Sequence, residues 1–233
     1  MRLSVLHYLA WVSAVFPVIA GARWALRLPK PRVAVLCWAL MLIFANGLAL
    51  FLGARGLNNH WVIYLSTPLS GVAVVVALIA WQVRDTPRLI LRVMVPLYLV
   101  AWTVIVALIE DIHTFSVVAG PFSSLILLVA ASCTLVGRSL HSLDPHTKQD
   151  WFWITIGFLI FYGVETGLPP LALLLVRSHP DLLDLAFQVR AAGMIVAMVL
   201  IAWGMLCPLP LPQSGGSSSR SASPSLSLPP LSG

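Results

Sequence analysis

Residues 61–82 read WVIYLSTPLSGVAVVVALIAWQ and contain no charged side chain. At the rise of an α-helix this stretch would extend about 33 Å, enough to cross a hydrocarbon core of about 30 Å. Its apolar residues run continuously instead of alternating with polar ones, which favours a helix over a strand of a membrane barrel. The stretch therefore predicts a membrane-spanning helix.

Six other stretches share this length and predominantly apolar character. The chain as a whole is 59% hydrophobic and 9% charged, with a mean hydropathy of +0.94, whereas a soluble domain carries about a quarter charged residues. Because the connections are short, consecutive helices should be antiparallel neighbours. We therefore expect an all-α, multi-pass membrane protein, with residues 1–207 forming a bundle of seven transmembrane helices in a lipid bilayer. The six other stretches are 4–26, 33–53, 89–109, 115–137, 151–176 and 183–206.

The composition changes abruptly after the last of these stretches. Residues 208–233 are rich in proline and serine, have no aromatic residue and carry a single charged side chain, Arg220. A segment of this kind cannot bury enough apolar surface to offset its chain entropy. We therefore expect residues 208–233 to be a disordered tail.

Basic residues are divided unevenly between the two sides of the predicted bundle. Lys and Arg near helix ends favour the cytoplasmic side of a membrane. This predicts that the N-terminus is outside and the tail is cytoplasmic. The net charge of +6 comes largely from these basic residues near the helix ends. They form no long basic patch, so no nucleic-acid partner is expected. The first, third and fifth connections hold Arg23, Arg27, Lys30, Arg32, Arg84, Arg88, Arg92, Arg138 and Lys148, and the other side holds Arg55 and Arg177.

The first stretch has a second interpretation. Arg2, the apolar residues after it and Ala20-Gly21-Ala22 resemble a secretory signal peptide with its cleavage site. Cleavage there would invert every following helix and put the arginine-rich connections outside, against the charge rule. The charge distribution therefore favours a retained first helix.

Two ionisable residues lie well inside the predicted helices, Glu165 and Arg190. Counted from the outer ends, Glu165 would be about 16 Å deep and Arg190 about 10 Å deep, so antiparallel neighbours would bring the guanidinium to the carboxylate. An isolated charge at this depth is costly, so we expect the two to pair. The pair is either a ligand, proton or gating site or a structural ion pair that fixes the register of its helices.

Three uncharged polar residues complete the candidate site: Asn46, Tyr162 and Gln188. Amide and hydroxyl side chains of this kind form hydrogen bonds between membrane helices. Together with Glu165 and Arg190, they are the candidate ligand or ion-pair residues of an outward-facing polar pocket.

Residue types that carry catalysis or hold cofactors are poorly placed. Lys30 and Lys148 are the only lysines, and both lie in connections, so no helix offers a lysine for the Schiff base of a retinal protein. The histidines lie near helix ends, and no phosphate loop, nucleophile elbow or metal-ligand spacing occurs. We therefore expect no catalytic residue, no metal site and no cofactor, and the protein is not predicted to be an enzyme.

Short motifs occur at two predicted helix starts. One is Asn58-Asn59-x-Trp61 leading to Thr67-Pro68, and the other is Asp150-x-Phe152-Trp153 with Gly157. They resemble those of a loose group of uncharacterised bacterial seven-helix integral membrane proteins. The resemblance would span most of the chain without the tail. It implies a bacterial cell inner membrane and carries no activity or site residue.

These observations lead to three functional hypotheses. The leading one is a non-catalytic sensor, ligand-binding or interaction subunit. It would need a membrane or cytoplasmic protein partner, because none of the predicted helices forms an output domain. The alternatives are a small-solute transporter and a purely structural subunit of a membrane complex.

Overall fold

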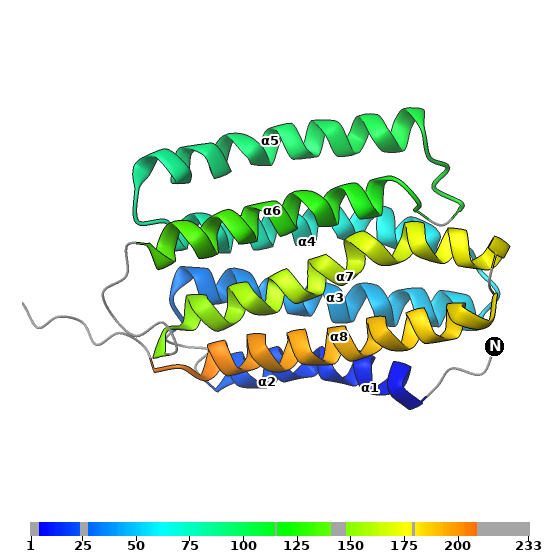
Figure 1. The fold of residues 1–233 in the computed structure, drawn as a ribbon, viewed down its shortest axis with the longest axis horizontal. Coiled ribbons are helices and arrows are strands. Elements are labelled where there is room, and N and C mark those ends of the chain that lie inside the picture. Colours follow the sequence, from blue (N-terminus) through cyan, green and yellow to red (C-terminus); the bar gives the residue numbers. More distant parts are fainter. Residues whose placement is uncertain (1–4, 24–27, 115, 141–147, 179, 209–233) are drawn as a thin grey trace, which may run out of the picture.

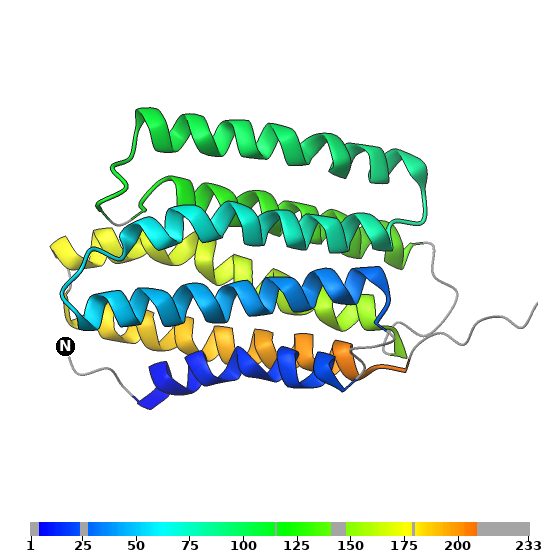
Figure 2. The same ribbon diagram turned by 180° about the vertical axis from the view of Figure 1, so that it is seen from behind.

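The computed structural model describes residues 5–23, 28–114, 116–140, 148–178 and 180–208. Within these residues the chain forms α-helices and no strand, which confirms the predicted all-α class. The helices run back and forth along one direction as an antiparallel bundle (Figures 1 and 2). Apart from Pro208, the predicted disordered tail lies outside the described residues. In chain order the helices are α1 (Val5–Ser13), α2 (Val15–Ala22), α3 (Lys30–Ala54), α4 (His60–Trp81), α5 (Asp85–Leu108), α6 (Ala119–Ser139), α7 (Asp150–Ser178) and α8 (Pro180–Leu206).

Six of these helices, α3 to α8, are long and apolar enough to cross a membrane. They correspond to the six stretches predicted after the first, and they suit a bilayer environment. Some begin before the predicted limit, as α3 does at Lys30 and α5 at Asp85. Proline is tolerated in the first turn of a helix, where its missing N–H would have no partner, so Pro31 and Pro87 do not stop these helices.

The first predicted stretch is not one long helix. α1 and α2 are separated at Ala14, where the chain turns. Pro17 explains the break, because it offers no N–H to the carbonyl of Ser13 and its ring crowds that carbonyl. The prediction of a single helix over 4–26 is therefore wrong, and residues 24–26 lie outside the described part.

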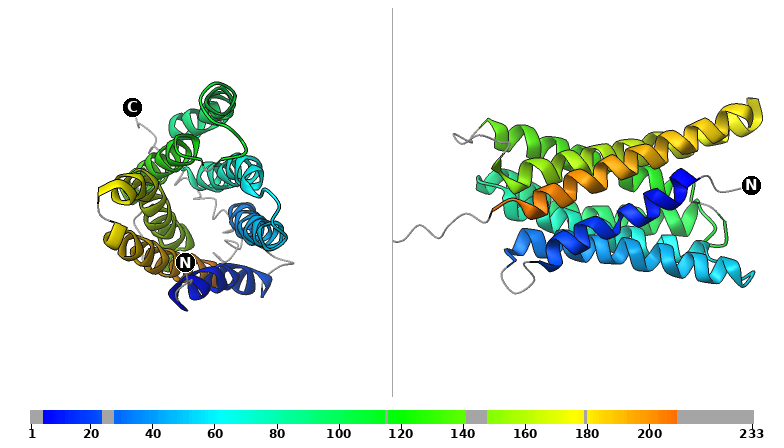
Figure 3. Two further views of the ribbon diagram at one scale, coloured as in Figure 1. Left: turned by 90° about the vertical axis from the view of Figure 1, so that its right-hand side faces the viewer. Right: turned by 90° about the horizontal axis from the view of Figure 1, so that it is seen from below.

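The core of the bundle lies between α3, α4, α6, α7 and α8. Trp38 is 1% exposed and packs edge-on against Phe158 and Phe161, with ring centroids 5.0 and 5.4 Å away. Such contacts add specific geometry to the burial of large apolar surfaces. α5 is the outermost helix (Figure 3), and its buried residues are Leu91, Tyr98 and Trp102.

Two glycines let α7 and α8 approach closely. A Cβ at Gly157 would lie 2.9 Å from the carbonyl oxygen of Ala197, and one at Gly204 would lie 2.9 Å from that of Asp150. Small residues at such positions allow helix backbones to pack tightly in membranes. This contact fixes α8 against α7 and thereby sets the relative position of the charged residues further along both helices.

The two ends of the bundle differ in charge. α3, α5 and α7 begin where α4, α6 and α8 finish (Figure 1), and we call this the basic end. The opposite end, which holds Glu110, Asp111 and Asp184, is called the acidic end. The division follows the one predicted from the connections. The basic end carries Arg23, Lys30, Arg32, Arg84, Arg88, Arg92, Arg138 and Lys148.

Candidate functional site

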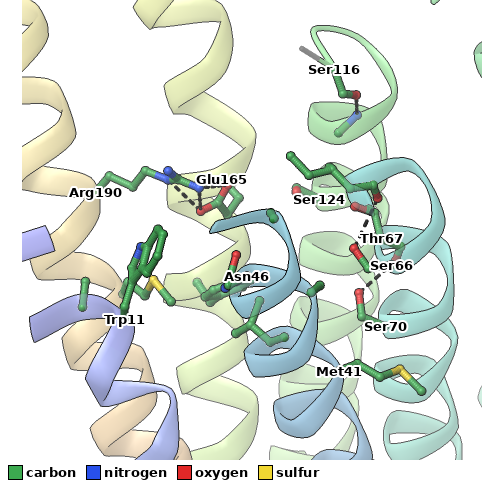
Figure 4. A pocket seen from close by; sticks show the side chains of 18 of the residues that line it. Trp11, Met41, Asn46, Ser66, Thr67, Ser70, Ser116, Ser124, Glu165 and Arg190 are labelled. Carbon is green, nitrogen blue, oxygen red and sulfur yellow. Dashed lines mark hydrogen bonds and ion pairs between the residues drawn. The ribbon is translucent and has the colours of Figure 1, made fainter. Parts of the chain in front are cut away.

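Glu165 on α7 and Arg190 on α8 meet between the two helices (Figure 4). Nε of Arg190 donates to Oε1 of Glu165 at 2.9 Å, and Nη2 donates to Oε2 at 3.1 Å. This is the two-pronged arrangement that guanidinium and carboxylate groups favour. The Glu165 side chain is 21% exposed and that of Arg190 is 42% exposed. The pair can therefore be reached from the space beside it, and its role as a ligand site stays a prediction.

A cavity of about 400 Å³ lies beside this pair, in the half of the bundle nearer the acidic end. Its walls come from α1, α3, α4, α6, α7 and α8, and small-molecule sites typically measure about 300–1,000 Å³. Figure 4 shows the charged pair on one side, hydroxyl groups on the other and Asn46 between them. Four of the five predicted residues line it: Asn46, Tyr162, Glu165 and Arg190.

The fifth predicted residue, Gln188, does not line the cavity. Its Nε2 donates to Oδ2 of Asp184 at 2.7 Å, one turn earlier on α8. Two positions on a helix differ by about 200° in direction, so Gln188 and Arg190 occupy nearly opposite faces. The polar character that made Gln188 a candidate does not specify which face of its helix it occupies.

Tyr162 is a buried polar group of the cavity wall, 5% exposed. Its hydroxyl oxygen accepts a hydrogen bond from Nε1 of Trp38 at 3.1 Å. Its ring packs edge-on against Phe161, with centroids 5.0 Å apart. In the described part of the chain, no residue accepts a hydrogen bond from the Tyr162 hydroxyl.

A row of hydroxyl groups faces the charged pair across the cavity. Ser66, Thr67 and Ser70 belong to α4, and Ser116 and Ser124 lie at the start of α6 or just before it. Ser70 donates to the carbonyl of Thr67 at 2.9 Å. Sequence reasoning missed this row, because such side chains can bond to their own helix and then carry no signal of function. The available signal was three hydroxyls within five residues of an apolar helix.

Glu110 anchors the part of the wall that contains Ser116. Oε1 of Glu110 accepts backbone N–H groups from Val117 at 2.7 Å and Val118 at 2.6 Å. Ser116 donates its hydroxyl to Oε2 at 3.0 Å and accepts the N–H of Gly120 at 2.9 Å. The carboxylate thus caps the N-terminus of α6, where a negative charge is favourable.

This environment changes the acidity of Glu110. Burial works to raise the pKa of its carboxyl, but the backbone N–H groups of Val118, Ala119 and Val117 and the Ser116 hydroxyl favour the charged form. The donors prevail, and the pKa of Glu110 lies below its ordinary value. The cap is therefore charged at neutral pH.

Polar residues at the acidic end form hydrogen bonds in pairs. Nδ2 of Asn58 lies 2.9 Å from Nδ1 of His113, and Nδ2 of Asn59 donates to the carbonyl of Ala49 at 2.8 Å. Among the residues that the structure describes, no three His, Cys, Asp or Glu side chains come together as a group that could hold a metal ion. These contacts fasten the connection between α3 and α4 next to the cavity.

A second ion pair, which the sequence did not predict, lies at the basic end. Arg32 is 0% exposed, and its Nε donates to Oδ2 of Asp150 at 2.8 Å. Its Nη1 donates to the carbonyl of Met205 at 3.2 Å, so α3, α7 and α8 are joined there. Sequence reasoning placed Arg32 in a connection after Pro31, but α3 has already begun at Lys30 and turns Arg32 inward.

Comparison of the chain with models of known protein families, with curated protein sequences and with solved structures found no match. The resemblance to bacterial seven-helix membrane proteins stays a prediction.

Proposed function

We propose that this chain is a non-catalytic multi-pass membrane protein that binds a small, uncharged, amphipathic molecule in the cavity beside Glu165 and Arg190. The proposal is carried by one observation: two charged side chains, which membrane helices usually avoid, share a single cavity with an amide and several hydroxyl groups. As a sensor or interaction subunit, the protein would relay binding through a membrane or cytoplasmic protein partner.

The charges in the cavity favour an uncharged ligand. Glu165 and Arg190 neutralise each other, so a charged ligand would have to break the pair or lie beside an unmatched charge. Tyr162 offers a hydrogen-bond donor, while Trp11 and Phe187 provide apolar wall. Few polar groups on a largely apolar wall are typical of sites for small amphipathic molecules.

The charge distribution supports one orientation of the helices in the membrane. We propose seven spans, with the kinked α1–α2 unit as the first, the N-terminus outside and the basic end in the cytoplasm. The cavity then lies in the outer half of the membrane, and its ligand would enter from outside. A bacterial cell inner membrane is the setting that we propose.

A small-solute transporter is the second candidate, and two observations favour it. Pro68 lies inside α4 between the cavity residues Ser66 and Ser70, and prolines in membrane helices can provide points of bending. Arg32 and Asp150 close the opposite end of the bundle, as an inner gate would. Transport would require this pair to open while the cavity closes on the other side.

The ligand proposal can be tested on the purified full chain in lipid nanodiscs. Uncharged amphiphiles (long-chain alcohols, quinones and monoacylglycerols) and matching carboxylic acids are screened for their effect on Tm. Ala49 lines the cavity, so Ala49→Phe should remove the stabilisation seen with the wild type. Leu40→Phe is the matched control, because Leu40 lies on the same helix, is 47% exposed and is not a cavity residue.

Two outcomes would contradict the proposal: equal stabilisation of wild type and Ala49→Phe by every active compound, or a consistent preference for the acids. An active compound also separates the two candidate functions. A transporter carries it into sealed vesicles and loses this flux in Glu165→Gln, whereas a sensor binds it without uptake.

A further inference from the structure

A second cavity, of about 340 Å³, lies at the basic end, away from the Glu165–Arg190 pair. It is enclosed by the connection between α4 and α5, the first turn of α5 and the last turn of α6. Its polar lining residues are Gln82, Arg84, Thr86 and Arg138, and Gly137 forms part of its wall. Nothing in the proposed function uses this cavity.

Arg138 is held beside this cavity by uncharged partners. It donates to the carbonyl of Trp81, and its guanidinium carbon lies 5.0 Å from the ring centre of Trp151. Arg138 belongs to none of the ion pairs found among the described residues. Asp150 is the acid whose charge acts on it, but Asp150 already binds Arg32 at 2.8 Å. The half-buried guanidinium is therefore positioned, and among the residues that the structure describes it has no acid of its own.

Arg84 brings a second positive charge to the cavity. It is exposed and, in the part of the chain that the structure describes, takes part in no ion pair. The neighbouring Arg88 is engaged elsewhere, with Nη2 bonded to the carbonyl of Gln82 at 2.8 Å and Nη1 3.4 Å from Oδ1 of Asp85. Asp85 is 98% exposed and paired with Arg88, so the described residues that line the cavity carry a net positive charge.

We propose that this cavity binds the phosphate of an anionic phospholipid headgroup. It lies at the ends of α4, α5 and α6, each long enough to span a bilayer, which is the level of the headgroups. Two guanidinium groups present the planar donors that match phosphate oxygens, and Thr86 adds a hydroxyl. Val83, which is 65% exposed beside the cavity, offers apolar surface to an acyl chain.

The test uses the full chain in nanodiscs of phosphatidylcholine, with or without phosphatidylglycerol, and counts retained lipids by native mass spectrometry. Wild type should retain phosphatidylglycerol selectively. Arg84→Gln should lower this retention roughly ten-fold, because it removes charge-assisted hydrogen bonds to the phosphate. Arg92→Gln is the control: it removes the same charge two turns further along the chain, inside α5, but Arg92 lines no part of the cavity.

Gly137→Leu provides an independent variant. A Cβ at Gly137 would meet nothing within 4 Å, so the added side chain should fill the cavity without disturbing the fold. It should keep the wild-type Tm and lose the selective retention. Equal retention by wild type, Arg84→Gln and Gly137→Leu would overturn the proposal. Displacement of the lipid by millimolar inorganic phosphate would also overturn it, since the cavity would then take free phosphate.

Discussion

Arg32 and Asp150 are 118 residues apart in the sequence, yet Nε of Arg32 lies 2.8 Å from Oδ2 of Asp150 in the buried basic end of the bundle. That pair joins α3 to α7, whereas the Glu165–Arg190 pair joins α7 to α8 nearer the acidic end. α7 is thus held by ion pairs at two separate points, to α3 at one and to α8 at the other. Only the second pair faces the larger cavity, so the two pairs should respond differently to mutation.

Arg32→Leu should lower the free energy of unfolding by about 3–5 kcal/mol, because it leaves the Asp150 carboxylate without its partner. Arg32→Leu combined with Asp150→Asn should recover part of this loss, since no unmatched charge remains. Thermal unfolding of the purified chain in detergent measures both. If the single variant is as stable as the double variant, the pair does not carry the stability assigned to it.

Glu165→Gln should cost less, about 1–2 kcal/mol, because the Arg190 side chain left unpaired is 42% exposed and lines the cavity, where water can partly screen its charge. Glu165→Leu combined with Arg190→Leu should restore the stability but abolish the Tm increase given by a cavity ligand. Ligand titrations followed by thermal unfolding separate these effects. An unchanged ligand response in the double variant would make the pair a packing element only.

Gly157→Ala should destabilise the bundle by about 1–3 kcal/mol, because the added Cβ would lie 2.9 Å from a backbone oxygen of α8 that cannot easily move. Gly167 is the matched control on α7, since a Cβ there would meet nothing within 4 Å. Gly167→Ala should be neutral or stabilising by up to about 1 kcal/mol. Chemical unfolding of both variants compares them, and equal effects would contradict the close packing of α7 on α8.

Glu110→Gln should lower the stability at neutral pH by about 1 kcal/mol, since an uncharged side chain caps α6 less well. The pKa of Glu110 is lowered in the folded chain, so its stabilising effect is complete above the ordinary value of 4.5 and is lost as the pH falls through the folded value. The stabilities of wild type and variant should therefore converge on acidification. A difference that stays constant with pH would show that the charge of Glu110 does not matter.

The six long apolar helices could be predicted from the sequence, because apolar stretches long enough to cross a bilayer can satisfy their backbone groups there only as helices or closed barrels. The stretch at 61–82 corresponds to α4 within one residue at each end. The first stretch failed because apolar length does not report the local effect of Pro17 on the carbonyl of Ser13. Composition therefore locates spans better than it locates breaks in them.

The candidate site was predictable in part for a similar reason. A charge inside an apolar stretch is conspicuous, so Glu165 and Arg190 could be identified before their contact was seen. Arg32 was overlooked because it lies among other basic residues near a helix end. The sequence there does not distinguish a buried arginine from an exposed one. The row of serines and threonines was missed because such residues are common in membrane helices and become informative only when several face one cavity.

The central claim is that the larger cavity is open to a ligand from the side of the N-terminus. Asn46→Cys, in a chain whose three cysteines are replaced by serine, can be treated in sealed vesicles with a membrane-impermeant thiol reagent added to either side. We predict rapid labelling from the side of residue 1, slowed by a bound cavity ligand, and none at the core control Leu78→Cys, whose position is 0% exposed. Labelling of Asn46→Cys only from the side of residue 233, or as slowly as the core control, would contradict the account.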